Sequence, residues 1–315
     1  MLNVLRANLA LPIIAALCLI CVTAGYTQSP AQPESDLLRQ GRQRMRQGNV
    51  GEALALYKQE LAKNPNSVAA NNAIGVALDL EGHTAEARKH FAKAIEAAPD
   101  ARTKAAAQRA MAMSYAFDND CANTMKYESM VIAYWVAEKD FYQQGEMMTE
   151  GARVCLEAGD FDTAYKYYKL GRDTGVKEPG IQPDRVSLWN YRWEHAQARI
   201  AARRGNAAEA TKHVASARAI LDKDSVLARA QEIFFPYLAG YVALYTGDPK
   251  TALADLAKAN QNDPFIQCLI GQAHEKIGER EQALQAYTKA FSTTAHNPPA
   301  AFAKPFARKK LAELK

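Results

Sequence analysis

The side chains best suited to chemistry in this sequence are arginines and tyrosines that recur at steps of three and four positions. Residues at these steps share one face of an α-helix. Arginine offers forked donors to carboxylates, and tyrosine buries apolar or planar groups at little rotamer cost. Two such stripes have side chains whose chemistry suits acidic and aromatic groups. The basic stripe is Arg192, His195, Arg199 and Arg203, and the aromatic stripe is Phe234, Tyr237, Tyr241 and Tyr245.

The same residues also fit a structural role. The aromatic side chains would then pack against neighbouring helices, and the arginines would be solvated or form ion pairs. Carboxylates available for such pairs are Glu157, Glu194 and Glu232. The sequence alone leaves the binding role and the packing role open.

Motifs of catalysis and metal binding are absent from the sequence. It contains no GxSxG, GxxxxGK[ST], HExxH or SxxK pattern. His274 and Glu275 begin like a zinc motif, but Gly278 occupies the place of the second histidine. The histidines do not pair at i, i+4 with another histidine or cysteine. We therefore expect a protein that is not an enzyme and that uses no cofactor and no metal.

Composition indicates a folded chain that does not bind nucleic acid. Of its 315 residues, 48% are hydrophobic and 23% are charged, which is enough apolar surface for a large core. The formal net charge of +5 is small and dispersed. Nucleic-acid binding requires a concentrated basic patch, so we expect no nucleic-acid partner.

The segments that must position these side chains form a repeating pattern. Each unit has a small residue seven positions before a turn residue, a small residue five positions after it, and usually a large apolar residue nine positions after it. Glu128 is the exception at this last position. Two helices meeting at a turn with positive φ explain the pattern, and stacked pairs would bury their apolar faces against their neighbours. The turn residues are Gly48, Gly82, Asn119, Gly159, Gly205, Gly247 and Gly278.

This pattern resembles the tetratricopeptide repeat family over residues 34–297. The resemblance implies an all-α fold, an α-solenoid of about seven helix-turn-helix repeats in a right-handed superhelix. It also implies a concave groove lined by the first helix of each repeat. The basic stripe would line this groove in the fifth repeat and the aromatic stripe in the sixth. The implied partner is another protein or a peptide segment with acidic and aromatic side chains.

The two ends of the chain differ from the repeat array. An apolar run from Leu9 to Ala24 ends in small residues, which indicates a cleaved signal peptide over residues 1–24 and a linker over residues 25–33. Retention of this run as an anchor stays open; after cleavage we expect no stable membrane span. At the other end, residues 298–315 are expected to form a capping helix that presents Arg308, Lys309 and Lys310 to water.

Two cysteines fall where neighbouring helices should meet. Cys121 starts the second helix of the third repeat, and Cys155 lies near the end of the first helix of the fourth. These helices should run antiparallel, so a disulfide between the two residues fits an oxidising compartment. Two buried free thiols fit the sequence as well.

These observations predict an exported scaffold or adaptor, periplasmic or extracellular, that binds proteins through its groove without catalysis. The alternative is a periplasmic module that binds a small or polymeric anionic ligand in the groove of repeats five and six. A ligand-binding module should have a closed, aromatic-lined pocket around these repeats. A scaffold should have an open groove along the whole array.

Overall fold

The computed structural model describes residues 34–314. The predicted signal peptide and linker lie outside this range. Within it the secondary structure consists of helices and turns, without a strand. The all-α fold predicted from the sequence is therefore confirmed.

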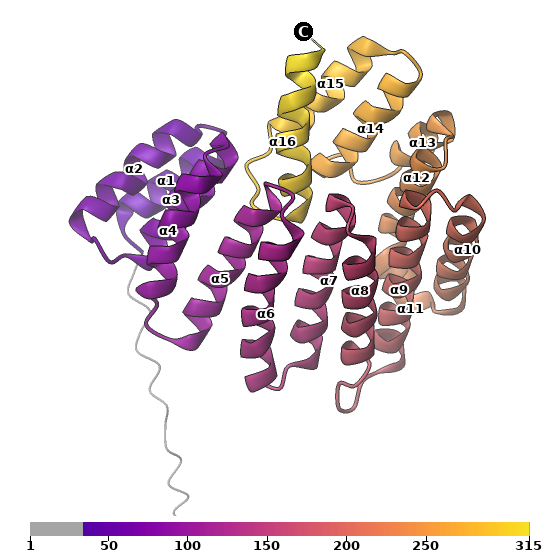
Figure 1. The fold of residues 1–315 in the computed structure, drawn as a ribbon, viewed down its shortest axis with the longest axis horizontal. Coiled ribbons are helices and arrows are strands. Elements are labelled where there is room, and N and C mark those ends of the chain that lie inside the picture. The colour runs from indigo at the N-terminus through magenta and orange to yellow at the C-terminus, as the bar shows by residue number, and fades with distance from the viewer. Residues whose placement is uncertain (1–33, 315) are drawn as a thin grey trace, which may run out of the picture. The chain divides into compact units, whose positions relative to one another are not determined.

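Most of the described helices form seven antiparallel pairs, with a short α-helix and a 3-10 helix before the sixth pair and one more helix after the seventh (Figure 1). The first helices of the pairs are α1 (Asp36–Arg46), α3 (Val68–Glu81), α5 (Ala101–Ala116), α7 (Phe141–Ala158), α9 (Pro183–Arg203), α12 (Phe235–Tyr245) and α14 (Pro264–Lys276). The second helices are α2 (Val50–Lys63), α4 (Thr84–Glu96), α6 (Cys121–Ala137), α8 (Phe161–Gly175), α10 (Ala207–Lys223), α13 (Pro249–Leu256) and α15 (Arg280–Phe291). We call the face built by the first helices the inner face.

The turn residues adopt the backbone conformation that the repeat pattern predicts. All seven have positive φ, from 55° at Asn119 to 99° at Gly247. This left-handed region is open to glycine and tolerated by asparagine. Asn119 therefore replaces glycine in the third pair without changing the turn.

The small residues of the pattern make room for the large ones within each pair. A methyl group at Gly75 would lie 2.6 Å from Phe91 Cε1, and one at Gly271 would lie 2.5 Å from Tyr287 Cε1. Both distances are far below van der Waals contact. Phe91 and Tyr287 are fully buried. The glycine and the aromatic ring thus fix how closely the two helices of a pair approach.

The first helix of the sixth pair is interrupted. Residues before Pro236 form α11 (Ser225–Gln231) and the 3-10 helix η1 (Glu232–Phe234) instead of a continuation of α12. Proline is well tolerated in the first turn of a helix, where its missing N–H has no intrahelical partner. The break leaves Ile233 and Phe234 exposed at the start of α12.

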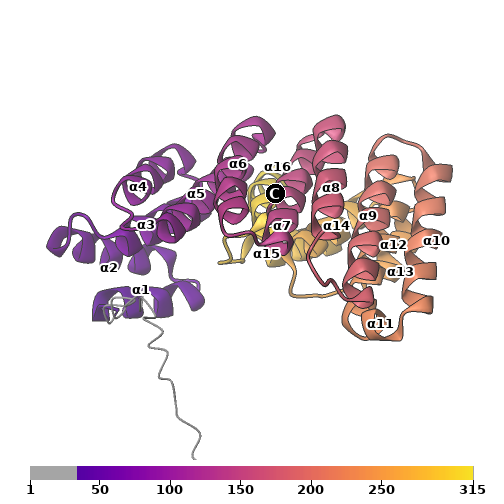
Figure 2. The ribbon, with the colours of Figure 1, turned by 90° about the horizontal axis from the view of Figure 1, so that it is seen from below.

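The last helix, α16 (Pro298–Glu313), contacts earlier repeats as well as α14 and α15. It packs on α5 and α7, and the figures show it beside them (Figures 1 and 2). Arg308 donates to the backbone oxygen of Leu80 at 3.0 Å, so it does not present its charge to water as we expected. Just before the helix, His296 Nε2 lies 2.8 Å from Asp79 Oδ2. The contacts of this end of the chain therefore reach beyond the stacking of neighbouring pairs that the repeat pattern predicts.

Glu128 occupies the position that large apolar residues fill in the other pairs. It is fully buried, and its Cγ lies 3.4 Å from the position of a methyl group at Gly151. Burial and the neighbouring Glu150 carboxylate hold the pKa of Glu128 well above its usual range. The folded state therefore favours the protonated side chain.

Replacing this carboxyl with an amide, Glu128→Gln, should stabilise the protein at neutral pH. The unfolded chain loses the Glu128 proton above pH 4.5 while the folded state keeps it, so wild-type stability falls by about 1.4 kcal/mol for each pH unit until the raised pKa is reached. The advantage of the variant should shrink to nothing below pH 4.5. Chemical denaturation of both proteins between pH 4 and pH 8 measures it.

Glu60 offers a matched control of opposite sign. It is also buried, but hydrogen bonds from Ser35 and Asn64 lower its pKa. Glu60→Gln should therefore destabilise the protein at neutral pH, and the loss should fade as the pH falls through the lowered pKa. Equal pH profiles for the two variants would contradict the environment assigned to Glu128.

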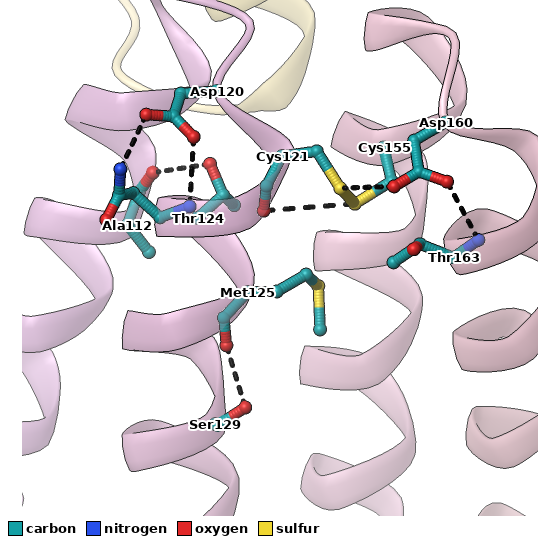
Figure 3. Close-up of a disulfide and its surroundings, with 10 residues drawn as sticks. Ala112, Asp120, Cys121, Thr124, Met125, Ser129, Cys155, Asp160 and Thr163 are labelled. Carbon is teal, nitrogen blue, oxygen red and sulfur yellow. Dashed lines mark hydrogen bonds between the residues drawn. A yellow bond between two sulfur atoms is a disulfide. The ribbon is translucent and has the colours of Figure 1, made fainter.

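A disulfide links the third and fourth pairs. Cys121 at the start of α6 is bonded to Cys155 near the end of α7, and their Cα atoms are 4.7 Å apart (Figure 3). Asp120 and Asp160 cap the helices that begin beside the bridge, accepting from Asn123 N and Thr163 N. Of the two states left open by the sequence, the structure has the bridged one. Cys268 is a buried free thiol.

Candidate ligand and partner site

A cavity of about 310 Å³ opens on the inner face between the fourth and seventh pairs. Its walls come from α7, α8, α9, the end of α11, η1, α12 and the N-terminus of α14. We name it the arginine–tyrosine cavity. Its lining includes Glu146, Arg153, Tyr168, Tyr191, Arg192, His195, Arg199, Ile233, Phe234, Tyr237, Asp263 and Ile266.

Arg199 is the most enclosed charge of the cavity, with 5% of its surface exposed. Its Nη2 donates to Tyr168 Oη at 2.9 Å, and its Nη1 lies 3.5 Å from Tyr237 Oη. No carboxylate within residues 34–314 forms an ion pair with it. A buried cation without a carboxylate is costly unless a ligand or a network compensates it.

Arg153 lies on α7 beside Arg199. Its Cζ is 5.9 Å from the centre of the Tyr237 ring and 5.7 Å from that of Phe265. Its Nε is buried and has no hydrogen-bond partner in the structure. Among the described residues, Arg153 has no ion-pair partner either. The two guanidinium groups thus give the cavity positive charge that the aromatic rings offset only in part.

The other charged groups of the cavity are already engaged. Arg192 Nη1 donates to Glu146 Oε1, which neutralises both side chains. Asp263 caps α14 by accepting from Phe265 N at 2.8 Å and from Ile266 N at 3.3 Å. Apart from the Arg192–Glu146 pair, Asp263 is the one carboxylate in the cavity lining that can offset Arg153 and Arg199.

Two further polar groups in the wall are neutral near pH 7. Burial and the charges of Arg199 and Arg153 hold the pKa of His195 well below its usual range. Burial and the charge of Glu232 raise the pKa of Tyr191 to about 12. Tyr191 is 2% exposed, and its hydroxyl has no hydrogen-bond partner. This hydroxyl is available to a ligand.

Family comparison matches both ends of the repeat array. Tetratricopeptide repeat models match residues 38–102 and residues 266–297. The chain is a tetratricopeptide-repeat protein. No curated protein is similar enough to match it.

Two solved structures are similar to most of the chain. A tetratricopeptide repeat protein from Parabacteroides merdae is 13% identical, with a TM-score of 0.50, over 88% of this chain and 97% of that one. The apo form of RapI is 11% identical, with a TM-score of 0.53, over 88% of this chain and 98% of that one. At these identities the similarity establishes the α-solenoid fold alone.

Five of the eight site residues predicted from the tetratricopeptide pattern line the cavity. Arg192, His195 and Arg199 line it from α9, Phe234 from η1 and Tyr237 from α12. The steps of three and four along α9 explain why its three residues share this face. Exposed apolar surface at the mouth comes from Phe234 and Ile233, which are 49% and 61% exposed.

The other three predicted residues are not cavity residues. Tyr241 is fully buried and donates to Glu157 Oε1 at 3.0 Å. Arg203 donates to Glu157 Oε2 at 2.7 Å, and its Cζ lies 4.8 Å from the centre of the Tyr245 ring. We correct the site accordingly: this cluster joins α7, α9 and α12 and is occupied by its own contacts. Of the three carboxylates named for the packing role, Glu157 is thus the one that pairs with the basic stripe.

Several cavity residues were not selected from the sequence. Tyr168 lies on a second helix, and Asp263 and Ile266 lie where α14 begins. The tetratricopeptide pattern assigns groove positions to first helices one repeat at a time. It carries no information on which distant repeats meet, so it could not bring α8 and α14 to the same wall.

Another depression of about 760 Å³ lies between α8, α9 and α10. Three of its four charged side chains already have partners: Arg172 donates to Asn190 Oδ1 at 2.8 Å, Glu194 Oε2 lies 2.6 Å from His213 Nδ1, and Asp224 caps α11. It therefore offers less to a ligand than the arginine–tyrosine cavity. None of the helices between residues 34 and 314 has the length and apolarity needed to cross a membrane.

Proposed function

We propose that this tetratricopeptide-repeat protein is an exported, non-catalytic scaffold that binds a partner protein at the mouth of the arginine–tyrosine cavity. The observation that carries the proposal is the exposed apolar surface of Ile233 and Phe234 beside Arg192 on the inner face. Aromatic and arginine side chains are the usual anchors of protein interfaces.

The last helix, α16, covers part of the inner face and so limits where a partner can bind. Because α16 packs on α5 and α7, that part of the face is occupied by the chain itself. The stretch over α9, η1 and α12 carries the five residues of the two predicted stripes that line the cavity. A partner segment with acidic and aromatic side chains would complement it.

Two features support export to the periplasm or the cell exterior. The apolar run before residue 25 ends in Val22, Thr23 and Ala24, as a signal peptide does. Disulfides such as that between Cys121 and Cys155 form and persist in oxidising compartments. N-terminal sequencing of the natural protein tests this point, and a mature chain that begins near Gly25 is expected.

A second candidate function is the binding of an anionic ligand in the same region. The specific observation that favours it is the cavity itself, which is aromatic-lined and holds two guanidinium groups without ion-pair partners among the described residues. An open groove along the whole array was the alternative expectation, and α16 covers part of that path.

A photo-crosslinking amino acid at position 234 tests partner binding in the native cell envelope. Position 165 on α8 is the matched control, because Tyr165 is 41% exposed but lies outside the cavity. We expect one protein to be captured from position 234 and not from position 165.

Purified partner then quantifies the contact. Phe234→Ala should weaken its binding by roughly tenfold or more, which is about 1.4 kcal/mol or more, and Tyr165→Ala should leave it unchanged. Equal capture at both positions, or equal affinity of both variants, would reject this surface as the partner site.

A further inference from the structure

We propose that the arginine–tyrosine cavity binds a small organic acid, with one carboxylate facing Arg153 and Arg199 and an apolar or aromatic body packed against Tyr237 and Ile266. This inference rests on the second candidate function and names its ligand class. It is independent of the partner protein.

The charge of the cavity selects a monoanion. Arg192 and Glu146 neutralise each other, which leaves Arg153 and Arg199 opposite Asp263. The remaining formal charge is that of one cation. A single carboxylate balances it, whereas a phosphate dianion would bury excess negative charge.

The hydrogen-bonding capacity of the wall suits a carboxylate. Arg199 uses part of its five donors on Tyr168, Tyr237 and its own helix, and Arg153 Nε is unpartnered. The Tyr191 hydroxyl is buried without a partner in the same cavity. Buried polar groups in native proteins are nearly always satisfied, so these donors indicate a missing acceptor. Carboxylate oxygens accept several such bonds at once.

The size and the apolar walls limit the body of the acid. A volume of about 310 Å³ is at the small end of ligand cavities, which favours a free small molecule over a polymer. The rings of Tyr237 and Phe234 and the Ile266 side chain form its apolar lining. A planar or branched hydrocarbon group fits such a lining.

The test uses purified protein and the probe 3-phenylpropionate. Its neutral amide, 3-phenylpropanamide, and inorganic phosphate are the comparison compounds. We expect calorimetric binding of the acid and a ligand-dependent rise in Tm, with the amide and phosphate at least about tenfold weaker. Binding should also raise the pKa of His195, seen by NMR titration, because the carboxylate offsets the two arginine charges.

Two variants separate a ligand-binding role from a structural one. Arg153→Met removes a cation without an ion-pair partner, so it should raise Tm without the acid and abolish the rise that the acid causes. Tyr191→Phe removes an unpartnered hydroxyl and should weaken acid binding several-fold with little change in Tm. Arg204→Met is the control, since Arg204 pairs with Asp162 outside the cavity.

Three results would overturn the proposal. The first is equal binding of the acid and the amide, and the second is unchanged acid binding in both Arg153→Met and Tyr191→Phe. The third is binding of a capped peptide that contains Glu and Phe, but not of 3-phenylpropionate, which would place the carboxylate on a partner segment. These measurements need no partner protein, so a failure to capture one at position 234 would not change their outcome.

Discussion

Phe91→Ala is expected to lower the free energy of unfolding by about 3–5 kcal/mol, the cost of a large buried cavity. Phe91 is fully buried and fills the space that Gly75 leaves open. Its ring also lies 5.8 Å from the ring of His296, centre to centre, in the segment before α16. The substitution therefore loosens one helix pair and its contact with the end of the chain. Urea denaturation followed by far-UV circular dichroism measures the loss.

Phe234→Ala is the matched control for Phe91→Ala. Because Phe234 is 49% exposed, its truncation should change stability by no more than about 0.5 kcal/mol. A similar loss in the two variants would mean that the second pair is not held by the glycine–phenylalanine contact.

Removal of the disulfide is expected to cost about 3–4 kcal/mol. The bond closes a loop across a sequence separation of 34, and its loss returns chain entropy to the unfolded state. The double variant Cys121→Ala and Cys155→Ala should show this shift in denaturation midpoint. Hydrogen exchange should quicken most in α6 and α7, the helices that the bridge joins.

Reduction provides the control for the double variant. Dithiothreitol should lower the midpoint of the wild type toward that of the variant and leave the variant itself unchanged. Complete alkylation of Cys121 and Cys155 in denatured but unreduced protein would show that the bridge does not form.

The repeated part of the fold follows from short-range sequence rules. Gly82 and Asn119 mark turns because few residues adopt positive φ. The glycine at position 75 predicts a large residue at position 91, because the Phe91 ring fills the space that a side chain at Gly75 would occupy. Glu128 breaks the rule for the large apolar position, and its burial beside Glu150 depends on tertiary packing. A pattern that reads one pair at a time locates the helices and misses what a single buried carboxyl group costs.

The candidate site was predictable where it lies on one helix. Arg192, His195 and Arg199 share a face of α9 by spacing alone. Tyr241 has the same spacing relative to Tyr237, yet it is buried against Glu157 because α12 packs on α9. Helix periodicity gives the direction of a side chain, and only the packing of whole helices decides whether that direction meets solvent or another helix.

The contact between α16 and the early repeats has a consequence for synthesis. Asp79 and His296, which precedes α16, are in contact although 217 positions separate them, and such a non-local contact forms only after the intervening chain is made. A ribosome releases α5 and α7 long before α16, and their apolar surface at that contact stays uncovered in the meantime. Folding of the nascent chain therefore ends with its last helix, and a premature stop there leaves a translation product with an open, aggregation-prone seam.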